Sequence, residues 1–174
     1  MKKLLVSASA LVALAVTATP AYAVPATEDA TATVRVLRPL QLTSTQNLDL
    51  QTVVLSGAGA FTATVGVAQD GTADCDAASG NVTCSGVMQP ALYEVRGAAN
   101  QVVDITVDAT LTLSNLTTPA APALTLTVDA PADVDLGADG NTGFIFAIGG
   151  SITVTEATVD GVYQGTFDVT ADYQ

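Results

Sequence analysis

The chain has 174 residues, and its 17 acidic residues outnumber its 5 lysines and arginines, which gives a formal net charge of −12. Such a charge repels nucleic acid and anionic lipid, so we expect neither as a partner. The chain has no histidine and no tryptophan, so serine and cysteine lack their usual base, sugars lack their main stacking residue, and we expect no enzymatic activity.

Residues 1–23 have the pattern of a secretory signal peptide. Lys2 and Lys3 precede an apolar run over residues 4–16, and Ala21-Tyr22-Ala23 is an A-x-A cleavage signature. The apolar run is too short to span a bilayer comfortably, although an uncleaved anchor is the alternative. We therefore expect export to the periplasm and a mature chain that starts at Val24. We expect this mature chain to form one domain. It contains three arginines and seventeen acidic residues, which gives a net charge of −14.

Residues 24–38 form an N-terminal extension that contains one alternating segment. Its apolar face carries Ala30, Ala32, Val34 and Val36. Thr31, Thr33 and Arg35 lie on the opposite face, and Pro39 ends the segment because proline cannot donate to a ladder. Two interpretations remain open. The segment is either the first strand of the domain's own sheet or a donor strand that leaves its domain and adds to an open sheet edge elsewhere.

Residues 39–174 contain a series of short predicted strands that predicts an all-β fold, a β-sandwich. Their positions are 40–43, 48–55, 61–67, 92–96, 102–107, 111–113, 124–128, 144–148, 152–154 and 166–173. We expect hairpins at 97–100 and at Gly149-Gly150, and loops over 69–80 and 129–143. No convincing helical period is present after the signal peptide.

Two cysteines, Cys75 and Cys84, lie on either side of a turn-rich segment. An even pair in an exported chain predicts a disulfide. A metal or redox pair, the alternative, needs C-x-x-C spacing or nearby histidines, and the chain has neither.

Acidic residues cluster in two predicted loops. Asp70, Asp74 and Asp76 form one cluster, and Asp133, Asp135 and Asp139 form the other. Carboxylates bind Ca²⁺, but neither cluster fits the EF-hand pattern. We therefore expect solvated loops, with no metal and no cofactor.

The last fourteen residues, 161–174, are the most regular stretch of the chain. Phe167, Val169, Ala171 and Tyr173 alternate with Thr166, Asp168, Thr170 and Asp172, which predicts a half-buried strand. A long exposed edge invites aggregation, so we expect this strand to be paired on both sides.

These residues also carry a family resemblance. Gly161, the penultimate Tyr173 and the alternating apolar residues between them resemble the C-terminal motif of chaperone–usher pilus subunits. The longer run over 144–154, followed by Gly-Val-Tyr-Gln-Gly-Thr-Phe, resembles the secreted bacterial family called domain of unknown function 4402, from about Thr31 to the end.

The resemblance implies a fold and a set of partners. The expected domain is an immunoglobulin-like sandwich that lacks its last strand, which a periplasmic chaperone supplies before the extension of the next subunit replaces it at the outer-membrane usher. It implies that Ala30, Ala32, Val34 and Val36 enter a groove. The groove wall and chaperone-recognition strand would be Gly161, Phe167, Val169, Ala171 and Tyr173.

Two functions from different classes follow. The first is a structural subunit of a surface pilus or fimbria, polymerised with other subunits by donor-strand exchange. The alternative is a monomeric secreted β-sandwich that works as a binding or adhesion module, in which residues 30–36 complete their own sheet.

Overall fold

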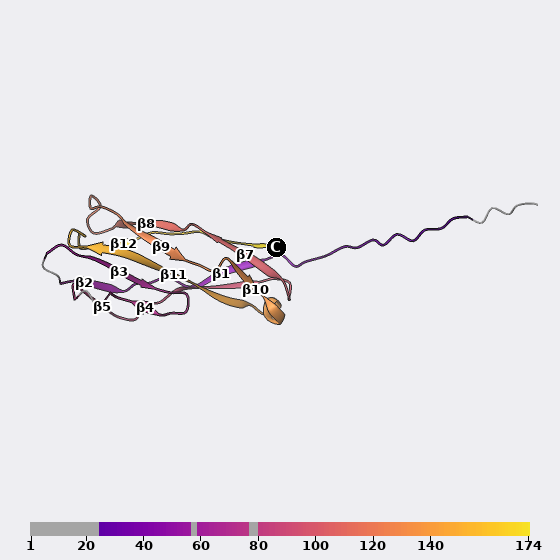
Figure 1. Ribbon diagram of the computed structural model, residues 1–174, viewed down its shortest axis with the longest axis horizontal. Helices are drawn as coiled ribbons and strands as arrows, with labels where there is room; N and C mark the ends of the chain where they lie inside the picture. Colours follow the sequence, from indigo (N-terminus) through magenta and orange to yellow (C-terminus); the bar gives the residue numbers. More distant parts are fainter. Residues whose placement is uncertain (1–24, 57–58, 77–79) are drawn as a thin grey trace, which may run out of the picture. The chain divides into compact units, whose positions relative to one another are not determined.

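The computed structural model describes residues 25–56, 59–76 and 80–174 (Figure 1). The predicted signal peptide lies outside the described residues. The chain divides into a unit that ends at Arg35 and a unit over Val36–Gln174. In the described part of the first unit, residues 25–35, no regular secondary structure is present and the side chains are exposed. No helix long and apolar enough to cross a membrane occurs in the described ranges.

The second unit is all-β, and every strand pair in it is antiparallel, which confirms the predicted fold class. The strands are β1 (Gln41–Gln46), β2 (Thr52–Leu55), β3 (Thr62–Val67), β4 (Ala73–Asp74), β5 (Val82–Ser85), β6 (Ala91–Arg96), β7 (Val102–Val107), β8 (Thr110–Asn115), β9 (Leu124–Asp129), β10 (Asp133–Asp135), β11 (Phe144–Thr155), β12 (Tyr163–Gln164) and β13 (Val169–Tyr173). A 3-10 helix, η2, spans Gly137–Asn141. The curled antiparallel sheets are those of a β-sandwich.

Strand β11 joins the two halves of this unit. Its first half pairs with β6, and its second half pairs with β3 on one side and β9 on the other. The largest sheet has the order β1-β6-β11-β9-β8-β12, with β3 and β4 attached through β11. Two smaller groups complete the unit: β10-β7-β13 and β2-β5.

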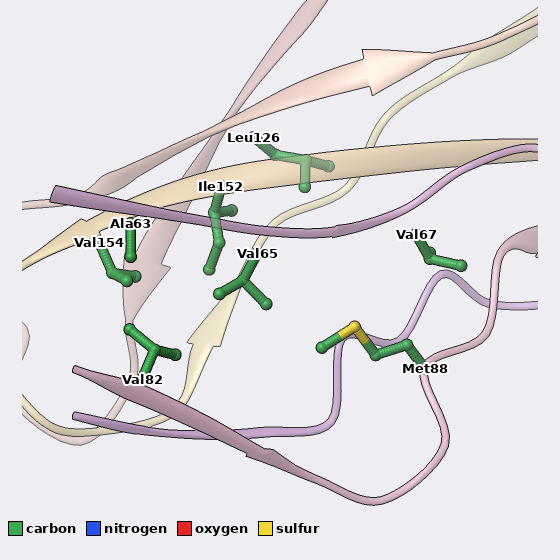
Figure 2. Packing of buried hydrophobic residues seen from close by; sticks show 8 residues of the cluster. All are labelled: Ala63, Val65, Val67, Val82, Met88, Leu126, Ile152 and Val154. Atoms are coloured by element: carbon green, nitrogen blue, oxygen red, sulfur yellow. The ribbon is translucent and has the colours of Figure 1, made fainter. Parts of the chain in front are cut away.

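Two hydrophobic clusters form the core. Cluster 1 lies between β3, β9 and β11 on one side and the β2-β5 ribbon on the other. Figure 2 shows Val82 and Met88 pointing toward Val65 and Ile152 from the opposite wall. Cluster 2 lies at the other end of β11, where β6 faces the β10-β7-β13 sheet, and its most buried members include Val95, Val103 and Ile148. Burial of these side chains supplies the main driving force for folding.

The predicted disulfide is confirmed. Cys75 and Cys84 are bonded, with their Cα atoms 6.0 Å apart. Cys75 follows β4, which pairs with β3, and Cys84 belongs to β5. The bridge therefore ties the edge of the large sheet to the β2-β5 ribbon, and both cysteines pack against cluster 1.

The hairpin predicted at Gly149-Gly150 is wrong, because β11 continues through both glycines. At this point the strand changes its neighbour from β6 to β3. A Cβ on Gly149 would lie 2.7 Å from the carbonyl carbon of Ala68. The glycines therefore permit close approach of another backbone rather than a turn.

The hairpin predicted at 97–100 is also wrong. β6 and β7 belong to different sheets, so the chain crosses the sandwich here. Gly97 N–H donates to Gly140 O at 2.8 Å, and Asn100 N–H donates to Gly137 O at 2.6 Å. The backbone groups that a hairpin would pair locally are thus bonded to η2.

Three further expectations need correction. The predicted loop 69–80 contains β4, which pairs with β3. The predicted loop 129–143 contains β10, which pairs with β7, and η2. Val134 and Leu136 from this segment are buried in cluster 2. The strand predicted over 48–55 begins only at Thr52. Asp49 accepts the backbone N–H of Gln51, which has a φ of 59°, and this turn interrupts extension.

Candidate functional site: the open edge of the C-terminal strand

The C-terminal segment alternates as its sequence predicts. Phe167, Val169, Ala171 and Tyr173 pack against cluster 2, whereas residues 166, 168, 170 and 172 are exposed. The strand itself, β13, covers only Val169–Tyr173 rather than 166–173. Its neighbour β7 ends at Val107, the partner of Val169, so the residues before Val169 have no ladder to join.

Within the described residues, β13 pairs with β7 and with no other strand, so the expected pairing on both sides is absent. Gln174 N–H donates to Val102 O, and hydrogen bonding alternates along an antiparallel pair. Thr170 and Asp172 therefore bond toward β7. The backbone groups of the odd-numbered residues 169, 171 and 173 point to the opposite edge. We call this edge the open edge of β13.

The apolar side chains next to the open edge are incompletely covered. Across cluster 2, Val103 is 0% and Ile105 6% exposed. Phe167 and Val169, by contrast, reach only intermediate burial. Leu42 of β1 lies against the same cluster and is also only partly buried. This part of the core is therefore less covered than its centre.

Tyr173 ties the end of β13 to the start of β1. Its hydroxyl donates to Arg38 O at 2.8 Å and accepts the Ala98 N–H at 2.7 Å. A Cβ on Gly97 would lie 2.8 Å from a methyl carbon of Leu40, so the tyrosine, this glycine and Leu40 meet at one point. The penultimate tyrosine thus closes one end of the sandwich.

The other end of the segment also approaches β1. The pKa of Tyr93 on β6 is raised, chiefly by burial and further by the charge of Asp168, while a hydrogen bond with Ser44 of β1 opposes the shift. Asp168 therefore lies near the β1-β6 pair. The C-terminal segment therefore approaches β1 at two points: Tyr173 meets Arg38 just before the strand, and Asp168 lies near Tyr93, the residue paired with Ser44. β1, like β13, has a strand partner on one side only among the described residues.

Gly161 has a local structural role. Its φ is 144°, and an added Cβ would overlap the side-chain amide of Asn115. Asn115 is 3% exposed. Its Nδ2 donates to Asp160 O at 3.1 Å, and its Oδ1 accepts the N–H groups of Thr117 and Thr118. The glycine thus lets the backbone pass close to the buried side chain of Asn115. Gly161 itself lies outside β13, which begins at Val169.

The residues predicted as a donor strand lie outside any sheet. Residues 25–40 contain no strand, and the side chains of Val34 and Val36 are 84% and 85% exposed. The side chains of the alternating apolar face, at residues 30, 32, 34 and 36, are all exposed.

Two acidic clusters were candidates for binding Ca²⁺, and the side chain of Asp139 in the second cluster lies outside the described residues. In the described part of the chain, no group of three or more acidic or cysteine side chains is arranged to hold a metal ion. Asp70 and Asp74 instead accept backbone N–H groups two residues further on, at Thr72 and Asp76. These bonds shape the turns, and at Asp70 the bond to Thr72 lowers the pKa of the carboxyl group.

The sequence alone did not predict the position of β13 in the fold. Sequence alternation identified its inward face but not that one edge stays open, nor the contact of Tyr173 with Arg38.

Comparison with curated proteins and with solved structures gave no match. The model of one family, described as a domain of unknown function (DUF4402), matches residues 40–173, which is most of the chain. The chain therefore belongs to the family of domain of unknown function 4402.

Proposed function

We propose that this chain is an exported structural subunit of a bacterial surface pilus, and that copies join when the extension of one adds to the open edge of β13 in the next. The observation that carries the proposal is a pair of complementary features in one chain. One is a strand edge with no strand partner among the described residues, beside a partly covered core, and the other is an alternating apolar segment whose side chains are exposed. Each supplies what the other lacks.

The energetics of such a junction are favourable. Residues 169, 171 and 173 each present a backbone donor and acceptor to the open edge, and a net hydrogen bond contributes about 1 kcal/mol. Full burial of each valine of the extension adds roughly 1.5–3 kcal/mol. The junction therefore gains several kcal/mol, which opposes the repulsion between two acidic chains.

An open edge is a liability before assembly, because it templates pairing with the wrong chains. We therefore also propose a periplasmic chaperone that covers the edge with its own strand and an outer-membrane usher where the extension replaces it. The predicted signal peptide accords with this route, with the periplasm as transit compartment and the cell surface as destination.

The test compares two single substitutions in the mature chain. Val34→Asp places a carboxylate on the face that enters the apolar core, which is costly unless the group is paired or protonated. It should abolish filaments seen by electron microscopy and leave monomer in sedimentation. Thr33→Asp, on the opposite face of the same segment, is the matched control and should polymerise. A Val34→Asp protein that polymerises as well as the Thr33→Asp protein would contradict the proposal.

A second candidate function is a monomeric secreted binding or adhesion module. The observation that favours it is the start of the family match at residue 40, which leaves residues 24–38 outside the shared domain. A mature protein that stays monomeric by sedimentation at every concentration, with a cooperative unfolding transition and no chaperone present, would support this module over the pilus subunit.

A further inference from the structure

The positive charge of the mature chain is concentrated in the extension. Residues 24–38 contain Arg35 and Arg38 against two acidic residues, whereas residues 39–174 contain one arginine against fifteen acidic residues. That arginine, Arg96, pairs with Glu94. This is the one ion pair in the described ranges, and Arg35 and Arg38 do not take part in it. Two mature chains of net charge −14 repel each other, so the segment that joins them benefits from carrying positive charge.

An acidic side chain lies beside the open edge of β13. Asp168 is exposed immediately before the strand, on its outward face, and its charge reaches Tyr93. Asp168 takes part in no ion pair among the described residues, and Arg96 is already paired with Glu94. Asp172 is the second exposed acidic residue on this face and lies four residues further along.

The geometry of strand addition limits which residues meet. All strand pairs in the second unit are antiparallel, and antiparallel pairing is more stable per residue than parallel pairing. The apolar faces must both point inward, since a slip of one residue would turn every valine outward. One antiparallel register places all four apolar residues of the extension opposite all four of the C-terminal segment. Its pairs are 36 with 167, 34 with 169, 32 with 171 and 30 with 173.

In this register Arg35 lies opposite Asp168. Even-numbered residues of β13 bond toward β7, so on the open edge position 170 forms a non-hydrogen-bonded pair. The same alternation, continued to the residue before β13, makes position 168 a non-hydrogen-bonded pair as well. The Cα atoms of such pairs are only about 4.5 Å apart, and the side chains are closest there. Opposite charges at a directly opposed position stabilise the pairing, whereas like charges destabilise it.

We infer that Arg35 of one copy pairs with Asp168 of the next copy, and that this ion pair fixes the register in which two copies join. The inference rests on the proposed function and goes one step further, because it names the partner residue. It also gives a reason for specificity. An extension without a positive charge at this position would meet an unpaired carboxylate.

Charge exchange in the mature, full-length chain tests the pair. Arg35→Glu should slow polymerisation about tenfold, because it opposes two carboxylates. Combining it with Asp168→Arg should restore the wild-type rate, since each junction then has the reversed pair. Combining it with Asp172→Arg is the matched control and should not restore the rate. Restoration by Asp172→Arg instead, or an Arg35→Glu protein that polymerises like wild type, would overturn the inference.

A disulfide trap tests the register and leaves Arg35 and Asp168 unchanged. Thr33 and Thr170 are opposed in the same register, at a separation that a disulfide can bridge. Chains with Thr33→Cys and Thr170→Cys should give a ladder of linked copies on a non-reducing gel after mild oxidation. Chains with Thr33→Cys and Asp172→Cys should not. Polymers with the opposite cross-linking pattern refute the register alone, whereas a wild-type chain that never polymerises refutes the proposed function and the inference with it.

Discussion

Gly161 gives the sharpest test of how the C-terminal segment is held. Its φ of 144° lies where side chains rarely go, and a Cβ would lie 2.6 Å from Nδ2 of Asn115 and still closer to Oδ1. Gly161→Ala therefore strains the backbone by about 1–3 kcal/mol. It also displaces a buried amide that makes three hydrogen bonds, and each bond lost inside the protein costs roughly 1–3 kcal/mol. We expect a total loss of about 2–5 kcal/mol in the free energy of unfolding.

Denaturant unfolding of the purified protein measures this loss as a fall in midpoint at unchanged slope. The matched control is Gly59→Ala, since Gly59 also has a positive φ, 102°, but an added Cβ would meet nothing within 4 Å. Gly59→Ala should therefore lower the free energy of unfolding only through backbone strain, with no steric contact added. Equal losses for the two variants would show that contact with Asn115 contributes nothing, and would refute the structural role given to Gly161.

Two further predictions concern stability. Thiol titration of the denatured, unreduced protein should find no free thiol, and replacing Cys75 and Cys84 by serine should cost about 2–3 kcal/mol in the chain-entropy model; two free thiols would contradict the bridge. The pKa of Tyr93 is raised above its usual 10.0, by burial first and then by Asp168. The contribution of the protonated Tyr93 side chain to the free energy of unfolding is therefore complete below pH 10.0, and it is lost as the pH rises through the folded-state pKa. Tyr93→Phe should remove this part of the alkaline fall in stability, and an identical pH profile for the two proteins would contradict it.

Much of the strand content was predictable because local alternation reports which face of a strand is inside. Ala63, Val65 and Val67 alternate in sequence and are at most 3% exposed in β3. The same argument predicted the inward face of the C-terminal segment correctly. The number of cysteines predicted the disulfide without geometry, because two cysteines offer only one intramolecular pairing.

The wrong hairpin at Gly149-Gly150 contained a signal that identifies the continuous strand. A two-residue turn would put Ile148 and Ser151 on the same face, which moves Ile152 to the other face. The apolar residues instead keep even numbers on both sides of the glycines, as one uninterrupted strand requires. Glycine alone therefore did not distinguish a turn from a close backbone approach, but parity across it did.

The candidate site, the open edge of β13, could not be predicted from the sequence for a different reason. Alternation describes the two faces of a strand, whereas strand addition depends on its two edges, and an edge is occupied or open according to neighbours that are distant in the chain. β13 pairs with β7, more than sixty residues earlier, and Tyr173 bonds to Arg38, which is 135 residues away. The extension presents the opposite case. Its alternation at residues 30–36 is as regular as that of β13, yet it forms no strand here. A strand-forming pattern without a strand, in a chain that also has a strand with an unoccupied edge among the described residues, is what the proposed assembly between copies requires. Only the pairing of segments far apart in the chain reveals both.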